Sequence, residues 1–300
     1  DLHSFPTRRS SDLHIDNAHV DAWRAVVDAV HAQGGRIVMQ LMHVGRIASH
    51  HNKRTEARTV APSAVRAKTK MFTDAAGLVD VDDPAPLSLP EIADVIEEYA
   101  QAARNARRAG FDGVELHATS GYLPMQFLAT NSNQRTDAYG GDAAKRARFV
   151  IEVLEAMSAA IGASRVGLRI GVGNPFNDVV DPDPRETYAA LLKGVASLGL
   201  AYLHALREQT EKASVFALAR GHFRGPLIVN DGFNFESATS VLAANTAEAV
   251  SFARHFIGNP DLVRRLRENL PLATFDRRTL YTPGAAGYVD YSRFADATSP

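Results

Sequence analysis

The sequence predicts an α/β protein in which parallel strands alternate with helices, and three observations support this. Short apolar runs and helical stretches alternate for six strands without a break in composition. No G-x-G-x-x-G turn follows the first strand, which disfavours a doubly wound dinucleotide-binding sheet. Polar residues gather at the carboxyl ends of the strands, where a (β/α) barrel places its active site. We therefore expect a (β/α) barrel.

The composition of the 300-residue chain is that of a globular protein. Lys and Arg number 33 against 34 Asp and Glu, so the formal net charge is −1 and gives no electrostatic case for nucleic acid or an anionic membrane. The chain has no Cys, which excludes disulfides, thiolate metal sites and a cysteine nucleophile. The 11 His lack the H-E-x-x-H spacing, so no metal is expected. No apolar run reaches the roughly 18 residues of a membrane span, and we expect a cytoplasmic protein.

The first residues do not resemble part of a fold. Residues 3–13 (HSFPTRRSSDL) carry two Arg and four Ser or Thr and lack the apolar centre of a secretory signal. They resemble the translation of a common sequencing adapter, so residues 1–13 are expected to be non-native. A natural basic, Ser-rich tail or transit-like peptide is the alternative. On the first interpretation, residues 14–300 carry the fold.

A helix, a strand and a long loop open the regular part of the chain. Apolar residues recur at helical spacing over residues 20–30, and a glycine pair follows the helix. Residues 36–41 (RIVMQL) predict a buried strand. Residues 43–90 are rich in polar residues and Pro, and they predict a long loop region of the kind that often forms a lid or a binding loop.

From Ser88 onward, helices and strands alternate. Ser88 is expected to cap a helix that runs to about Ala109, with Glu91 at the capping-box position. The arginines at 264, 265 and 267 are expected on the solvated face of the last helix. Such alternation is what a parallel sheet covered by helices requires. The further predicted strands are residues 113–118, 166–170, 202–206, 226–230 and 249–254, and the further predicted helices are 141–161, 185–198, 211–221, 236–244 and 260–269.

One long block and five shorter ones stand out in the chain. The long block is GFDGVELHATSGYLPMQFLATNSNQRTDAYGG, residues 110–141. The shorter blocks are QLMHVGR (40–46), VGLRI (166–170), FNDVVDPDP (176–184), HFIGNPDLVRRL (255–266) and LYTPGAAGYVDY (280–291). In this order, over about residues 16–294, they resemble the old yellow enzyme family, the flavin-dependent ene-reductases.

The resemblance implies a (β/α)8 barrel that holds FMN at the mouth formed by the carboxyl ends of its strands. It also implies that two strands of the family barrel, which contact the flavin, precede the first helix seen here. The chain is therefore expected to be an N-terminally truncated barrel with about six of eight strands. Loss of two strands exposes two sheet edges, so such a chain is expected to be inactive or nearly so.

Two residues are expected to bind the flavin ring. The resemblance assigns Gln40 to the pyrimidine edge, and its carboxamide offers suitable donors and an acceptor. Arg169 lies among apolar neighbours in its strand, where an unpaired guanidinium is costly. It matches the family Arg that stabilises the negative charge of the reduced flavin. An internal Arg–carboxylate pair is the alternative.

Three residues are expected at the FMN phosphate. Asn230, Gly232 and Arg254 lie in the segments that match the family's phosphate-binding turn and its Gly-Arg pair. Asp231 stands where the family usually has Gly. Its carboxylate would repel a phosphate unless the side chain turns away, so weaker FMN binding is expected.

The reaction centre is expected at His117, Ser120 and Tyr122. The resemblance implies that His117 and Ser120 hydrogen-bond the substrate carbonyl oxygen, which polarises the C=C bond, and that Tyr122 protonates the α carbon. The family usually has Asn or His in place of Ser120, so a water bridge or Thr119 is considered there. His117 taken alone would more often be a satisfied core histidine. Tyr281 matches an aromatic residue near the flavin and substrate, although packing at the barrel edge explains it equally well.

The implied function is that of an ene-reductase. NADPH or NADH reduces FMN, and a hydride then passes to the β carbon of a small α,β-unsaturated substrate. A monomer or homodimer without nucleic-acid or membrane partners is expected. One alternative is a truncated, inactive fragment of such a barrel. The other is a different TIM-barrel enzyme, such as an aldolase or isomerase, but no predicted strand carries the Lys that a Schiff base needs.

Overall fold

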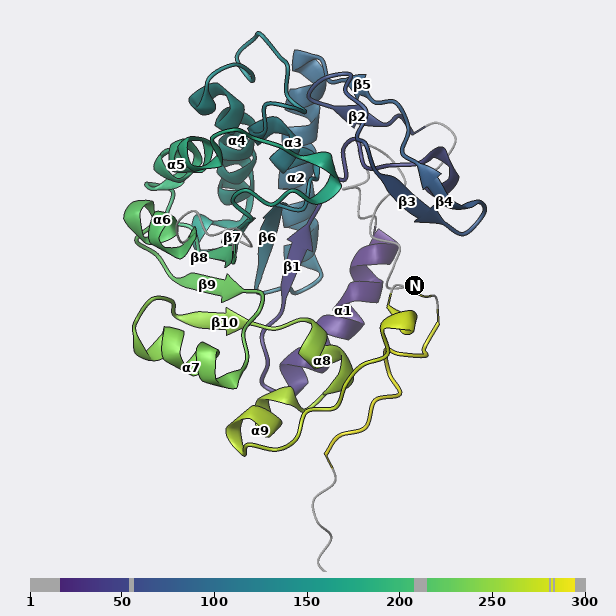
Figure 1. Cartoon of the computed structure of the whole chain (residues 1–300), viewed down its shortest axis with the longest axis vertical. Helices are drawn as coiled ribbons and strands as arrows, with labels where there is room; N and C mark the ends of the chain where they lie inside the picture. Colours follow the sequence, from purple (N-terminus) through teal and green to yellow (C-terminus); the bar gives the residue numbers. More distant parts are fainter. Residues whose placement is uncertain (1–16, 54–56, 208–214, 281, 283, 295–300) are drawn as a thin grey trace, which may run out of the picture. The chain divides into compact units, whose positions relative to one another are not determined.

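The computed structural model describes residues 17–53, 57–207, 215–280, 282 and 284–294 (Figure 1). Residues 1–13, expected to be non-native, and Tyr281 lie outside the described residues. The chain divides into two compact units, a larger one within residues 6–229 and a smaller one built on residues 230–300.

A parallel sheet forms the centre of the larger unit. Gln40 lies opposite Glu115 in this sheet. Two residues further along the strands, Arg169 lies between His117 and His204. Each strand therefore pairs with the next along the chain, as in a βα-repeat barrel. The neighbouring strands are, in order, β1 (Val38–Leu41), β6 (Gly113–Ala118), β7 (Val166–Ile170), β8 (Tyr202–Leu206) and β9 (Leu227–Asn230).

Helices pack against the outer face of this sheet. α2 contacts β1 and β6, α4 contacts β7, and α6 contacts β8, while α4 lies between α2 and α5 (Figure 1). Val114, Leu116 and Leu168 are fully buried and form part of the apolar layer beneath the helices. The helices are α1 (Asn17–Ala32), α2 (Leu89–Arg108), α3 (Leu123–Leu128), α4 (Ala143–Ile161), α5 (Pro184–Val195) and α6 (Val215–His222).

The capping box predicted for α2 is confirmed. The Ser88 hydroxyl accepts from the Glu91 backbone N–H, and the Glu91 carboxylate accepts from the Ser88 backbone N–H at 2.8 Å. Two of the four donors at the start of the helix are thereby satisfied. The helix begins where these two residues predict it.

The segment 43–90 is more regular than the long loop expected for it. Lys53 and Asp82, both largely buried, form an ion pair at 2.9 Å that fastens the segment internally. Strands of two to four residues are too short to give a periodic signal, which explains why the sequence did not reveal them. The segment contains a 3-10 helix (His50–Asn52), a parallel pair β2 (Val60–Ala61) and β5 (Ala85–Pro86), and an antiparallel pair β3 (Lys70–Thr73) and β4 (Gly77–Asp80).

The smaller unit corrects two expectations. The strand predicted over 249–254 ends at Ser251, so Arg254 begins a helix instead of ending a strand. Arg265, expected on a solvated helix face, is buried because its guanidinium bonds Asp261 at 2.7 Å and lies over the ring of Phe294. The elements are α7 (Phe235–Ala243), β10 (Ala249–Ser251), α8 (Arg254–Gly258), α9 (Leu262–Arg267) and a 3-10 helix (Arg277–Thr279).

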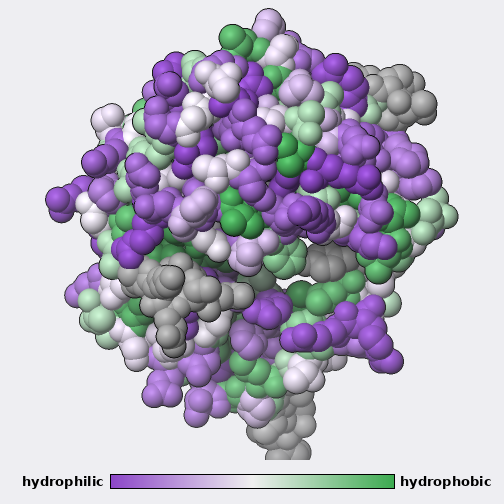
Figure 2. All heavy atoms as spheres, turned by 45° about the horizontal axis from the view of Figure 1, so that its top comes forward, coloured by the Kyte–Doolittle hydropathy of each residue, from purple (hydrophilic) through white to green (hydrophobic). Residues whose placement is uncertain are grey.

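The surface is polar with scattered apolar side chains. On the face seen in Figure 2, apolar side chains form separate patches among hydrophilic ones. Phe72 and Leu78 lie opposite each other on the β3–β4 hairpin and are about two-thirds exposed. Among the described residues, no helix is long and apolar enough to cross a membrane.

Candidate active site

Polar side chains from four neighbouring strands share one face of the sheet. Side chains alternate along a strand, so Glu115 and His117 of β6 lie on the face opposite the buried Val114 and Leu116. The register places Gln40 of β1 beside Glu115, and Arg169 beside His117 and His204. We call this set of five residues, Gln40, Glu115, His117, Arg169 and His204, the inner row. Two predicted cofactor residues and one predicted catalytic residue belong to it.

His117 is buried without a hydrogen-bond partner. It is 8% exposed, and neither ring nitrogen has a partner within the described part of the chain. Burial, with a further contribution from the charge of Arg169, lowers the pKa of His117 to about 4. The ring is therefore neutral at neutral pH and carries one N–H donor. Burying such a donor unpaired is costly, so the structure does not support a satisfied core histidine.

The turn after β6 holds the other two predicted catalytic residues. Tyr122 is the residue immediately before α3, and its ring centroid lies 5.4 Å from that of His117. Ser120 has φ of +59°, a left-handed conformation that few residues other than Gly adopt. Its carbonyl oxygen accepts from the Asn177 side chain at 2.8 Å, which ties the turn to the loop after β7. The structure thus brings His117 and Tyr122 together and holds Ser120 in a constrained turn.

Thr119, considered as a substitute for Ser120, faces a different environment. It is fully buried, and its hydroxyl oxygen has no partner in the portion of the chain described. A Cβ at Gly171 would lie 2.2 Å from that oxygen, so Thr119 occupies the space that a side chain at position 171 would take. Ser120 remains the more accessible hydroxyl of the two, because it is only partly buried.

Arg169 has neighbours that the sequence analysis missed. Its Nη1 lies 2.9 and 3.0 Å from the two ring nitrogens of His204. His204 in turn lies 2.9 Å from the carboxylate of Glu115, which also accepts from Gln40 Nε2 at 2.6 Å. The strand of Arg169 contains no acidic residue, so the sequence around it does not indicate this carboxylate. Glu115, an acidic residue inside the otherwise apolar strand GVELHA, is the sequence feature that could have indicated a buried partner.

The predicted phosphate residues lie in the smaller unit. Asn230 Nδ2 donates to the carbonyl oxygen of Ser251 at 2.8 Å. Arg254 Nη2 donates to the Asp231 carboxylate at 2.8 Å, so Asp231 is turned towards Arg254. Asp231 and Gly232 both have positive φ, of +77° and +68°. The guanidinium expected to bind phosphate therefore already has an internal anionic partner.

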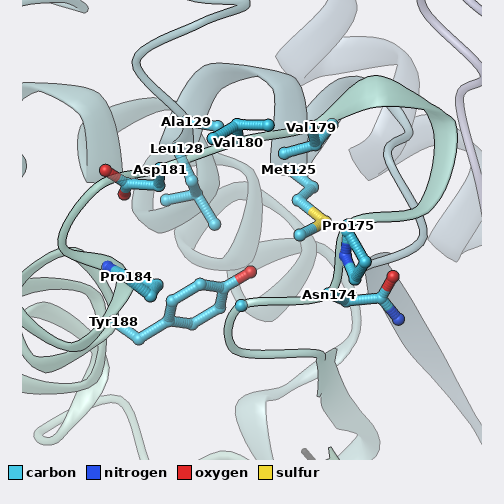
Figure 3. A pocket seen from close by; sticks show the side chains of 11 residues that line it. Met125, Leu128, Ala129, Asn174, Pro175, Val179, Val180, Asp181, Pro184 and Tyr188 are labelled. Carbon is cyan, nitrogen blue, oxygen red and sulfur yellow. The ribbon is translucent and has the colours of Figure 1, made fainter. Parts of the chain in front are cut away.

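A cavity beside α3 and α5 is too small for a flavin. Its volume is about 120 Å³, whereas pockets for ligands of drug size or larger usually span about 300–1,000 Å³. Figure 3 shows the ring of Tyr188 and the side chains of Met125 and Leu128 pointing towards a common space. The remaining lining comes mainly from the loop after β7. No group of three or more His, Asp or Glu in the described ranges is placed to hold a metal ion.

Comparison of the sequence with known proteins gives consistent matches. The sequence model of the NADH:flavin oxidoreductase / NADH oxidase family matches residues 4–273. A probable flavin mononucleotide-dependent alkene reductase of Leishmania infantum is 41% identical over 287 residues, which cover 92% of this chain and 77% of that protein. 12-Oxophytodienoate reductase 2 of Arabidopsis thaliana is 35% identical over 287 residues, with 91% and 75% covered.

Solved structures match the fold closely. Morphinone reductase in complex with tetrahydroNAD superimposes with a TM-score of 0.90 at 38% identity, covering 95% of this chain and 80% of that one. The old yellow enzyme homologue from Zymomonas mobilis gives a TM-score of 0.89 at 35% identity, with 93% and 80% covered. These matches confirm the predicted barrel-type α/β fold.

Proposed function

Because the chain belongs to the NADH:flavin oxidoreductase / NADH oxidase family, an FMN-dependent family of oxidoreductases, we propose that it reduces activated C=C bonds of α,β-unsaturated carbonyl compounds. When bound, FMN supplies the hydride, which it first takes from NADH or NADPH. The protein supplies binding, orientation and electrostatics around it. An oligomeric state of monomer or homodimer stays a prediction.

Gln40 and Arg169 of the inner row offer groups that suit the ring of a flavin. Gln40 is exposed on the inner face and offers amide donors and an acceptor to the pyrimidine edge. Arg169 offers a permanent cation to the side of the ring where negative charge builds on reduction. The unpartnered nitrogens of the buried His117 provide the observation that favours a bound group over a closed core. In the smaller unit, Asn230, Gly232 and Arg254 would hold the phosphate.

His117, Ser120 and Tyr122 would act on the substrate. The neutral His117 donates its N–H to the carbonyl oxygen of the enone, and the Ser120 hydroxyl donates a second bond. Both bonds strengthen as the oxygen gains charge, which lowers the barrier. Tyr122 then donates its phenolic proton to the α carbon. The juxtaposition of the unpartnered His117 with the ring of Tyr122 is the single observation that carries this assignment.

The replacement Tyr122→Phe tests the proton-donor role. We expect it to slow reoxidation of the reduced flavin by 2-cyclohexenone by about 10²–10⁴-fold, because a positioned proton donor contributes that much. Reduction of the flavin by NADH or NADPH should keep its rate, and stopped-flow absorbance follows both steps. Tyr139→Phe is the matched control, since the Tyr139 hydroxyl bonds Glu152 of α4. Equal slowing of both half-reactions in Tyr122→Phe would refute the assignment.

A further inference from the structure

A buried carboxylate lies at the centre of the inner row. Glu115 is in the middle of β6, and its side chain is 9% exposed. One carboxylate oxygen accepts from Gln40 Nε2 at 2.6 Å, and the other lies 2.9 Å from His204 Nδ1. Burial and the neighbouring charge of Glu115 raise the pKa of the Tyr202 hydroxyl. Glu115 therefore links β1 to β8 across the sheet.

The absence of a side chain at Gly167 makes this link possible. Gly167 lies opposite Glu115 on one side and Tyr202 on the other. A Cβ at Gly167 would lie 2.3 Å from Cζ of Tyr202 and 2.8 Å from its hydroxyl oxygen. The ring of Tyr202 thus occupies the place of the missing side chain and brings its hydroxyl across β7. Side chains from two strands, β1 and β8, therefore meet at one buried carboxylate of β6.

Glu115 stays ionised despite its burial. Burial alone raises the pKa of Glu115, but the hydrogen bond and charge of His204, with smaller contributions from Gln40 and Arg169, outweigh it. The net pKa lies below the usual value for a glutamate. An ionised carboxylate only accepts hydrogen bonds, so each of its neighbours must turn a donor towards it. The charge therefore dictates the orientation of the groups around it.

That orientation matters for both residues proposed to bind the flavin ring. The carboxylate requires Nε2 of Gln40, which turns Oε1 of the amide away and leaves it to accept from a ligand. It also takes the Nδ1–H of His204, which holds the imidazole ring with both of its nitrogens within 3.0 Å of Nη1 of Arg169. One carboxylate thereby sets the direction of the Gln40 amide and, through His204, of the Arg169 guanidinium.

We propose that Glu115 is a positioning residue of the flavin site, which holds Gln40 directly and Arg169 through His204 in the orientation that receives the ring. This inference rests on the proposed function, because it presumes that Gln40 and Arg169 bind FMN. It goes beyond that function by giving a role to three side chains, Glu115, Tyr202 and His204, that touch neither substrate nor cofactor in the proposed reaction.

Two substitutions separate the position of the carboxylate from its charge. Glu115→Gln keeps the shape and removes the charge. We expect it to raise the Kd for FMN about tenfold or more and to shift the reduction potential of bound FMN to a more positive value, because a nearby negative charge is gone. Glu115→Asp keeps the charge but is too short to reach both Gln40 and His204. We expect it to raise the Kd for FMN with little change in potential.

The orientation itself is measured on the FMN-free chain. The ¹⁵N spectrum of His204 should show the Nδ1–H tautomer in the wild type and a loss of that preference in Glu115→Gln. Glu152→Gln is the matched control, because it removes a carboxylate that accepts from the Tyr139 hydroxyl at 2.7 Å on α4. This control should change neither the potential nor the His204 signals, and denaturation of each variant reports whether it folds.

The outcomes distinguish a failure of this inference from a failure of the proposed function. If the wild type binds FMN and both Glu115 variants match its Kd within about twofold with an unchanged potential, the inference alone is wrong. An unaltered His204 tautomer in Glu115→Gln overturns it as well, even if that variant binds FMN poorly. A wild type that does not bind FMN at all overturns both the inference and the proposed function.

Discussion

Ser120 occupies a backbone conformation that suits a different residue. Its φ of +59° lies in the left-handed region, where Asn is several-fold enriched over most residues. The resemblance to the old yellow enzyme family implies Asn or His at this position. Serine therefore has both the shorter donor and the less favourable backbone preference.

We expect Ser120→Asn to keep or raise turnover of 2-cyclohexenone and to keep or raise the stability of the fold. The Asn carboxamide reaches further than a hydroxyl and tolerates positive φ. Ser120→Ala, as the matched variant, should lower kcat by up to about 10²-fold, because it removes one donor to the developing charge. Steady-state kinetics with FMN-saturated protein measure both effects. A loss of turnover in Ser120→Asn as large as that in Ser120→Ala would contradict the donor role.

We expect Asp231 to weaken binding of the FMN phosphate. It adopts φ of +77°, where a non-Gly residue is strained, and its carboxylate binds Arg254 at 2.8 Å. Asp231→Gly should relieve strain of about 1 kcal/mol and release Arg254, which lowers the Kd for FMN about tenfold, the scale of one charge-assisted hydrogen bond.

Fluorescence titration of FMN and of riboflavin tests the Asp231 effect. Riboflavin has no phosphate, so its affinity should not change in Asp231→Gly. Asp231→Asn serves as the control, since it removes the charge while keeping a residue that tolerates positive φ. If riboflavin and FMN gain equally, Asp231 does not act on the phosphate.

At the scale of elements, the loop after β7 supports the turn after β6. The side chain of Asn177 donates to the Ser120 carbonyl oxygen. A Cβ on Gly121 would lie only 2.5 Å from the carbonyl oxygen of Phe176, so the loop packs closely against the turn. The next residue, Asp178, accepts from Arg46 at 2.5 Å and from Asn131 at 2.7 Å through its carbonyl oxygen. The loop after β7 thus holds the Ser120 carbonyl oxygen and is itself held by Arg46 and Asn131.

Two substitutions of Asn177 distinguish the effect of its side-chain hydrogen bond from the effect of its backbone conformation. Asn177 has φ of +58°, so Asn177→Ala should destabilise the protein by about 1–2 kcal/mol more than Asn177→Gly does. Both variants lose the bond to Ser120 and should slow reoxidation of the flavin without weakening FMN binding. Urea denaturation and stopped-flow absorbance measure the two effects. Reoxidation at the wild-type rate in Asn177→Gly would show that the bond does not support the reaction centre.

Elements with a clear period could be predicted, and those without one could not. β6 and β7 match their predicted bounds because their apolar runs end at charged or glycine-rich turns. β3 and β4 were missed because each has only four residues, too few to carry a periodic signal. α3 was missed because its six residues form less than two turns. Longer elements can be predicted from their own residues, whereas short elements depend on the parts of the chain that pack against them.

The site shows the same division. His117, Ser120 and Tyr122 lie within six residues of each other, so their proximity follows from the strand and the turn after it. Glu115 and His204 could not be paired from the sequence, because their contact depends on the register of β6, β7 and β8 and on the missing side chain at Gly167. Parallel strands bring together residues that are about 90 positions apart, and only the fold reveals which of them meet.

At the scale of the whole molecule, His117 links the site to the stability of the fold. Its pKa of about 4 lies below the value of 6.5 expected for an unfolded chain. As pH falls through 6.5, the unfolded chain binds a proton that the folded chain does not, so stability is lost between about pH 6.5 and pH 4. The carboxyls of Asp82 and Asp112 have pKa values lowered to about 2, and their contributions are lost only at lower pH.

We therefore expect the wild type to lose about 2 kcal/mol of unfolding free energy between pH 7 and pH 5 that His117→Gln does not lose. The difference between the two proteins isolates His117, because the other titrating groups are common to both. Urea midpoints at the two pH values give the measurement. If both proteins lose the same free energy, the ring of His117 does not stay neutral in the folded chain.

We propose above all that this chain holds FMN and passes its hydride to an activated C=C bond. The most direct measurement mixes the protein carrying photoreduced FMN with 2-cyclohexenone under anaerobic conditions. The account predicts that the visible absorbance of oxidised flavin returns and that about one cyclohexanone forms per bound FMN, with NADH or NADPH absent. Protein that holds FMN but leaves it reduced in the presence of the enone would contradict the account and favour an inactive barrel fragment.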